Sequence, residues 1–182
     1  MKRVALTFIG QDRPGIIAEI SRCLFKSGCN IEDATMTILE GEFAMILIAL
    51  LPSSDIESEL KKEFEFLKKR LGLYHFWKTL PVKKLLMVKH PAGAKTYVIS
   101  IIGKDKTGIV YETSHVLAKF RLNITDLNSK LTGGSSRPLF TMILEVDIPN
   151  RFNIKRLSWA LKRLSRRMRV DVQIRPLERL FL

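Results

Sequence analysis

Hydrophobic and polar positions form two kinds of pattern near the start of the chain. Residues 4–9 form a short run rich in strand-forming residues that ends at Gly10, as is typical of a short strand. From Ile16 to Leu24 the apolar residues recur at helical spacing, and Gly28 ends that run. The pattern therefore predicts a strand followed closely by an amphipathic helix.

Four further elements follow in the same part of the chain. Residues 31–39 and 43–51 are predicted to be two strands joined by a hairpin around Gly41, and a second helix runs to about residue 71. A last strand is expected at about 74–82. The order β-α-β-β-α-β is typical of a ferredoxin-like domain, an α+β fold with two helices on one face of a four-stranded antiparallel sheet.

The pattern occurs twice along the chain. Residues 4–33 align with residues 97–126 at a constant offset of 93, which becomes 97 after four extra residues within 133–138. Such an insertion is tolerated in a glycine-rich turn. The predicted organisation of the 182-residue chain is a first domain at 1–84, a connection at 85–95 and a second domain at 96–182.

Composition narrows the class of protein. With 46% hydrophobic and 27% charged residues, the chain is neither disordered nor fibrous. Cys23 and Cys29 make no disulfide framework and match no metal-binding spacing, and Cys23 falls on the apolar face of the first helix, where a core position is expected. No apolar segment is long enough for a signal peptide or a membrane span. We therefore expect a protein of the reducing cytoplasm.

The loop between the first strand and the first helix is a candidate ligand site. A strand ends at Gly10 and a helix begins within six residues, so unpaired N–H groups and the positive end of the helix dipole face the loop, where they can bind an anion. Asp12 is expected to cap the helix, with Pro14 and Gly15 in its first turn, and Asn30 is expected to enter the second strand near the same loop. A purely structural interpretation, in which these residues only cap the helix and shape the turn, is the alternative.

The motif resembles the signature of the ACT domain family. The first copy reads Gly10-x-Asp12-x-Pro14-Gly15-Ile16-Ile17 followed by Asn30-Ile31-x-Asp33, and the second copy repeats it with Thr107 where the family usually has proline. ACT domains are regulatory modules that commonly bind amino acids where two of them meet. The resemblance implies ligand-binding residues in both copies: Asp12, Arg13, Gly15, Ile16 and Asn30, and Asp105, Gly108, Ile109 and Asn123. The tandem layout is similar to the glycine cleavage system repressor group, which acts in transcriptional control through partner proteins.

Residues typical of enzymes do not form a catalytic pattern. The chain has no nucleophile elbow, phosphate-binding loop or metalloprotease motif. Its three histidines, His75, His90 and His115, have no metal-ligand spacing. We therefore predict no catalysis, no cofactor and no metal.

Positive charge is concentrated near the end of the second copy. The chain carries 31 basic and 18 acidic residues, a net charge of +13, and residues 151–182 contribute ten of the basic and two of the acidic ones. At helical spacing an apolar stripe is expected at Ile154, Leu157, Leu161, Leu164 and Met168. Candidate contacts for a partner or for nucleic acid lie outside that stripe: Arg156, Trp159, Lys162, Arg163, Arg166 and Arg167. A solvated helix face, with Trp159 packed on a neighbouring domain or subunit, is the alternative.

Two functions follow as expectations. The first is a non-catalytic regulatory protein, a homodimer, that binds an amino acid at a domain interface and signals through a protein partner in transcriptional control of amino-acid metabolism. The second is a basic docking module that binds nucleic acid or an acidic protein through the last helix and needs no small ligand.

Overall fold

The computed structural model describes residues 1–81, 90, 92–133 and 138–177. The chain divides into two compact units, Met1–Leu85 and Leu86–Leu182, called unit 1 and unit 2. Most of the expected connection at 85–95 and the tip of the glycine-rich insertion at 134–137 fall outside the described residues. The domain boundaries therefore stay a prediction.

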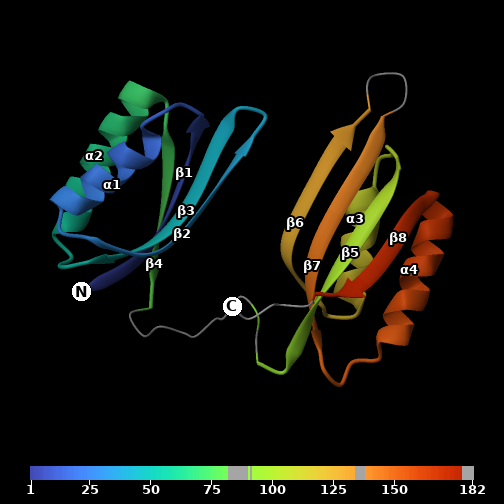
Figure 1. Ribbon diagram of the computed structural model, residues 1–182. Coiled ribbons are helices and arrows are strands. Elements are labelled where there is room, and N and C mark those ends of the chain that lie inside the picture. Colours follow the sequence, from blue (N-terminus) through green and yellow to red (C-terminus); the bar gives the residue numbers. More distant parts are fainter. Residues whose placement is uncertain (82–89, 91, 134–137, 178–182) are drawn as a thin grey trace. The chain divides into compact units, whose positions relative to one another are not determined.

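Unit 1 has the predicted order of elements. They are β1 (Lys2–Gln11), α1 (Ile16–Lys26), β2 (Asn30–Leu39), β3 (Glu42–Leu51), α2 (Ile56–Leu71) and β4 (Tyr74–Leu80). The strands form one antiparallel sheet in the order β2-β3-β1-β4, so that β2 and β4 are its edges. Both helices lie on the same face of this sheet (Figure 1).

Unit 2 repeats this architecture. Its elements are β5 (Ala94–Lys104), α3 (Ile109–Lys119), β6 (Asn123–Thr132), β7 (Leu139–Pro149), α4 (Ile154–Met168) and β8 (Val170–Pro176). The sheet order is β6-β7-β5-β8, again antiparallel throughout. The expected fold class, two tandem ferredoxin-like βαββαβ domains, is confirmed.

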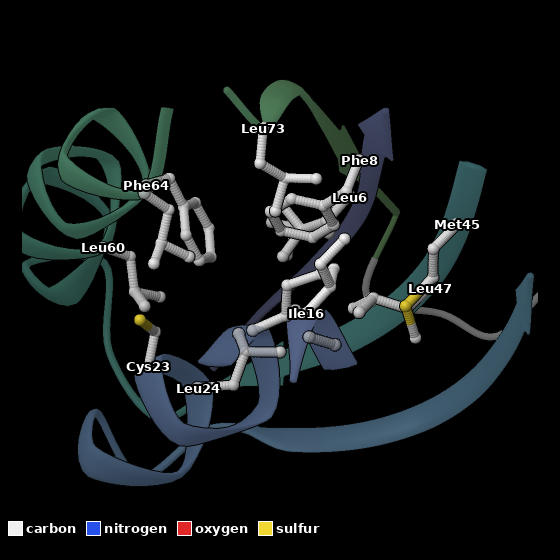
Figure 2. Close-up of a cluster of buried hydrophobic side chains, with 14 of the residues drawn as sticks. Leu6, Phe8, Ile16, Cys23, Leu24, Met45, Leu47, Leu60, Phe64 and Leu73 are labelled. Atoms are coloured by element: carbon white, nitrogen blue, oxygen red, sulfur yellow. The ribbon is translucent and has the colours of Figure 1, made fainter. Parts of the chain in front are cut away.

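Alternation along the strands places one apolar face of each sheet against the helices. In unit 1 the alternate residues Val4, Leu6 and Phe8 of β1 are fully buried, and the rings of Phe8 and Phe64 from α2 form a T-shaped pair with 5.0 Å between centroids. Figure 2 shows Leu6, Phe8 and Phe64 with Cys23 of α1, which is only 2% exposed, so its expected core position is confirmed. Burial of such side chains is the main favourable contribution to folding.

The apolar stripe of α4 packs in the same way in unit 2. Leu157, Leu161, Leu164 and Met168 are buried, and Ile154 packs against them at the start of the helix. The basic residues between these positions face outward because the helical period separates the two faces. The predicted stripe is therefore confirmed.

Glycine is required where the first strand of each unit passes the start of its last strand. A Cβ atom on Gly10 would lie 2.8 Å from the carbonyl oxygen of Gly72, and one on Gly103 would lie 2.8 Å from Cγ1 of Val170. The repeated glycine at the end of β1 and β5 thus allows close packing of neighbouring backbones.

Candidate ligand-binding loops

Gly15, rather than Asp12, precedes the first helix. α1 begins at Ile16, and Gly15 at its N-cap position has φ 94° and ψ −8°, a left-handed conformation that favours glycine. The expectation that Asp12 caps this helix is wrong, because the left-handed turn at Gly15 places the helix start four residues beyond Asp12. The backbone N–H of Asp12 instead donates to the carbonyl of Gly41 at 2.8 Å, which ties the loop to the β2–β3 turn.

The second loop has the same backbone geometry as the first. Gly108 has φ 96° and ψ −1°, and α3 begins at the next residue. The N–H of Asp105 donates to the carbonyl of Pro138 at 3.3 Å, the counterpart of the bond between Asp12 and Gly41. Thr107, which stands where the first copy has Pro14, therefore leaves the conformation of the loop unchanged.

Each loop presents backbone N–H groups to solvent. The first helical hydrogen bond of α1 runs from Glu19 N–H to the Gly15 carbonyl at 3.0 Å, and the N–H groups of residues 16–18 precede it in the helix. Asp12 and Gly15 are exposed around this helix end, and Asp105 is exposed in the corresponding loop of unit 2. The loops can therefore accept a carboxylate at the positive end of a helix dipole.

Three of the candidate side chains are engaged elsewhere. Ile16 and Ile109 are each 3% exposed and belong to the cores of their units, so only their backbone faces the loop. Arg13 donates from Nη2 to the carbonyl of Leu71 at 2.8 Å. A positive charge at the C-terminal end of α2 stabilises that helix end, which gives Arg13 a structural role.

The asparagines lie at the other end of the sheet from the loops. Asn30 is level with Leu50 of β3, whereas Gly10, next to the loop, is level with Phe43. Seven residues of β3 separate these levels, about 23 Å at 3.3 Å per residue. The expectation that Asn30 lies near the mouth of its own loop is therefore wrong, because α1 carries the chain back along the sheet before β2 begins.

Unit 2 has the same separation. Asn123 is level with Asp147, and Gly103 is level with Phe140, again seven residues along the central strand. Within one unit, therefore, a small ligand cannot contact the loop and the asparagine together.

Edge strand β2 leaves apolar side chains exposed. All ten of its residues are exposed, including Ile31, Met36, Ile38 and Leu39, and its hydrogen-bonding partner within unit 1 is β3 alone. An edge of this length with apolar side chains is a typical pairing surface for another strand.

The predicted contact residues of α4 are exposed, and a second helix joins them. Trp159 is 61% exposed and carries the guanidinium of Arg163 over its ring at 4.9 Å. Tyr111, His115 and Lys119 of α3 lie beside them and were not predicted. No spacing along the sequence connects the two helices, so only the packing of α3 against α4 could identify these residues.

His90 and the two cysteines take structural positions. His90 Nδ1 lies 2.9 Å from Oδ1 of Asp147, which also accepts from Thr96 at 2.9 Å. Burial raises the pKa of the Cys23 and Cys29 thiols, which favours the unreactive protonated form.

Among the described residues, no group of three or more His, Cys, Asp or Glu side chains is placed to hold a metal ion. None of the described helices is long and apolar enough to cross a membrane.

Comparison with known proteins gives a family for both units. A family model described as the ACT domain matches residues 2–78 and 95–175. A UPF0237 protein of Methanocaldococcus jannaschii is 40% identical over 74 residues, which make up 40% of this chain and 82% of that protein. A UPF0237 protein of Methanopyrus kandleri is 39% identical over the same shares of the two chains.

Two solved structures share the whole tandem fold. A protein of unknown function from Galdieria sulphuraria has a TM-score of 0.77 at 24% identity, over 97% of this chain and 99% of that one. A protein provisionally described as a glycine cleavage system transcriptional repressor has a TM-score of 0.70 at 18% identity, over 98% of each chain. At these identities the likeness is one of fold.

Proposed function

The chain belongs to the ACT domain family, and from this premise we propose that it is a non-catalytic regulator that binds a free amino acid and passes the bound state to a protein partner. ACT domains are regulatory and often bind amino acids. The duplicated domain occupies most of the chain, 2–78 and 95–175.

The repeated loop geometry is the observation that carries this proposal. Gly15 and Gly108 adopt nearly the same left-handed conformation, with φ 94° and 96°, although proline in one loop is replaced by threonine in the other. Each loop offers helix N-terminal N–H groups to a carboxylate, and Asp12 or Asp105 lies close enough in the chain to pair with an ammonium group.

Pairing of β2 edges between two copies of the chain would complete the first site. Two β2 strands related by a twofold axis run antiparallel, so Asn30 of one copy lies opposite the Leu39 end of the other when the axis passes through the strand centre. That end adjoins the turn at Gly41, which is bonded to Asp12. A homodimer would thus bring together the loop and the asparagine that a single unit holds apart.

Ligand binding at such a junction would act by population shift. An amino acid that contacts both copies binds the paired arrangement more tightly than the unpaired one, and it can shift the equilibrium only by that difference in affinity. We propose that a partner protein binds preferentially to the arrangement in which the two β2 strands are paired. The fold shared with a protein provisionally described as a transcriptional repressor supports a partner in transcriptional control of amino-acid metabolism.

A thermal-shift screen of the full chain against the twenty amino acids tests this function. We expect one amino acid, or a small chemically related group, to raise the unfolding temperature, with about 2.7 kcal/mol of stabilisation at 100 times the dissociation constant. Asn30→Ala should abolish the shift if the first site binds, and Asn123→Ala if the second does.

Asn128→Ala is the matched control. Asn128 is an exposed asparagine of β6 outside the repeated motif, so this substitution should leave the shift unchanged. A shift that survives both Asn30→Ala and Asn123→Ala would contradict the proposed sites. No shift with any amino acid would contradict the sensor function itself.

A further inference from the structure

We propose that a groove between α3 and α4 of unit 2 binds an acidic amphipathic helix of the protein partner. The inference rests on the proposed signalling through a partner, and it specifies the surface and the chemistry involved. The groove has a volume of about 870 Å³. Both helices lie on the same face of the sheet of unit 2, and the other face is not covered by a helix of that unit (Figure 1).

The groove has an apolar floor and a basic, aromatic rim. Val116 of α3 and Ala160 and Leu164 of α4 form the floor. The rim residues are Tyr111, His115 and Lys119 on one side and Trp159, Arg163 and Arg166 on the other. Such a lining suits an apolar side chain flanked by negative charge.

Charge on the rim is almost entirely positive. Glu112 is the acidic residue of the lining, and its carboxylate is already paired with Arg167 across the two helices. Within the described part of the chain, no carboxylate lies within ion-pair distance of Lys119, Arg163 or Arg166. These cations are therefore available to a partner.

The charge belongs to unit 2 as a whole. Unit 1 contains 13 basic and 11 acidic residues, whereas unit 2 contains 18 basic and 7 acidic ones. The two units have the same fold, so the fold itself does not require the surplus. Electrostatic complementarity selects an acidic partner and accelerates its association.

Unit 1 shows which features of the groove are particular to unit 2. The ion pair Arg70–Glu19 joins α2 to α1 as Arg167–Glu112 joins α4 to α3. Around this shared contact the side chains differ in the aligned positions: Ala18, Lys62, Glu63 and Phe66 of unit 1 stand where unit 2 has Tyr111, Trp159, Ala160 and Arg163. The helix packing is common to both units, whereas the open floor and the aromatic rim belong to unit 2.

Two exposed aromatic rings mark the rim as a contact surface. Trp159 is 61% and Tyr111 63% exposed, and each ring is held in place by a neighbour one turn away. Arg163 covers Trp159, and His115 stacks on Tyr111 at 5.5 Å between centroids. Large, preorganised aromatic side chains are typical of residues that contribute most to protein–protein affinity.

The geometry favours a protein helix over nucleic acid. A sugar-phosphate backbone is charged along its length and has no aliphatic side chain to fill the floor at Val116, Ala160 and Leu164. One face of the Trp159 ring is already covered by Arg163, which leaves less of it for base stacking. From Trp159 to Arg167 the groove extends for about 12 Å along α4, the length of about two turns of a bound helix.

Binding of a designed acidic peptide to the full chain tests the inference. The probe is a fluorescein-labelled helical peptide of about four turns, with leucines along one face and glutamates elsewhere, followed by anisotropy at physiological ionic strength. We expect Arg163→Glu with Arg166→Glu to weaken binding at least tenfold, and Trp159→Ala to weaken it about tenfold.

Arg151→Glu with Lys155→Glu is the matched control, just before and at the start of the same helix. It makes the same change in charge at exposed positions outside the groove lining, and we expect less than about a threefold loss of affinity. All variants should keep the parent's circular dichroism and unfolding temperature, because every substituted side chain is exposed.

Any of four results would overturn the inference. The first is that the peptide does not bind, and the second is that the groove variants and the control variant lose equal affinity for it. The third is that a peptide with serine in place of leucine binds equally well. The fourth is that single-stranded DNA binds more tightly than the peptide and loses affinity in the groove variants. The proposed function is tested separately. Peptide binding without a thermal shift by any amino acid would contradict only the sensor function, and a thermal shift without peptide binding would contradict only the proposal that the groove binds a helix.

Discussion

His75 lies on the helix-facing side of β4 with a ring nitrogen that lacks a partner. Its ring packs against Phe64 at 5.5 Å between centroids, and no described residue accepts from or donates to the buried Nδ1. Burial lowers the pKa of His75 below the ordinary value of 6.5, since the charged ring is poorly solvated there. Folding therefore favours the neutral ring.

His75→Phe should stabilise unit 1, and more so in acid. Below about pH 6.5 the unfolded state binds a proton that the folded state does not, so the parent's free energy of unfolding falls as the pH falls. The variant lacks this loss and also the unpaired nitrogen, which costs about 1 kcal/mol. Thermal unfolding from pH 8 to pH 5 measures both, and parallel profiles for parent and variant would contradict the argument.

At the scale of elements, the hydrophobic pattern of the first copy, together with the repeat, predicted all six elements of each unit. Strand ends were less well predicted: β1 extends over Lys2–Gln11 rather than 4–9 because all ten of its residues pair with β3. The position of Asn30 was predicted wrongly because a sequence motif gives only the order of residues along the chain. The length of α1 decides at which end of the sheet β2 begins.

A complementation experiment tests whether two copies share the first site. We expect Asp12→Ala and Asn30→Ala to abolish amino-acid binding when each variant is assayed alone. In randomly mixed dimers, half pair one chain of each kind and hold one intact site of two, so about a quarter of the parent's binding capacity should return. Calorimetric titration measures that capacity. If each variant alone shows no binding and mixing restores none, a first site shared between two copies is contradicted.

At the scale of the whole molecule, the chain contains two separate hydrophobic cores. The two clusters of buried residues share no member, and each unit contains one of the two tryptophans. Trp77 packs against the core of unit 1, whereas Trp159 is exposed on α4. The repeat in the sequence predicted the two units. The groove of unit 2 could not be predicted, because it is formed by residues of α3 and α4 that become neighbours only when the two helices pack together.

Phe64→Ala should therefore destabilise unit 1 alone. Removing this fully buried ring is expected to cost about 3–5 kcal/mol. In a Trp159→Phe background, Trp77 fluorescence should report the lowered transition, while calorimetry should retain an unchanged second transition for unit 2. A single transition that shifts as a whole would indicate that the two units unfold together.

The uneven division of charge between the units has a kinetic consequence. Of the net charge of +13, unit 2 carries +11 and unit 1 only +2. In dilute salt an anionic molecule diffusing nearby is drawn to one unit of the chain in preference to the other, so productive collisions become more frequent without any tighter final complex. Added salt should lower the association rate constant and leave the lifetime of the bound state nearly constant. The salt dependence of the two rates therefore separates long-range electrostatic attraction from short-range contacts in the complex.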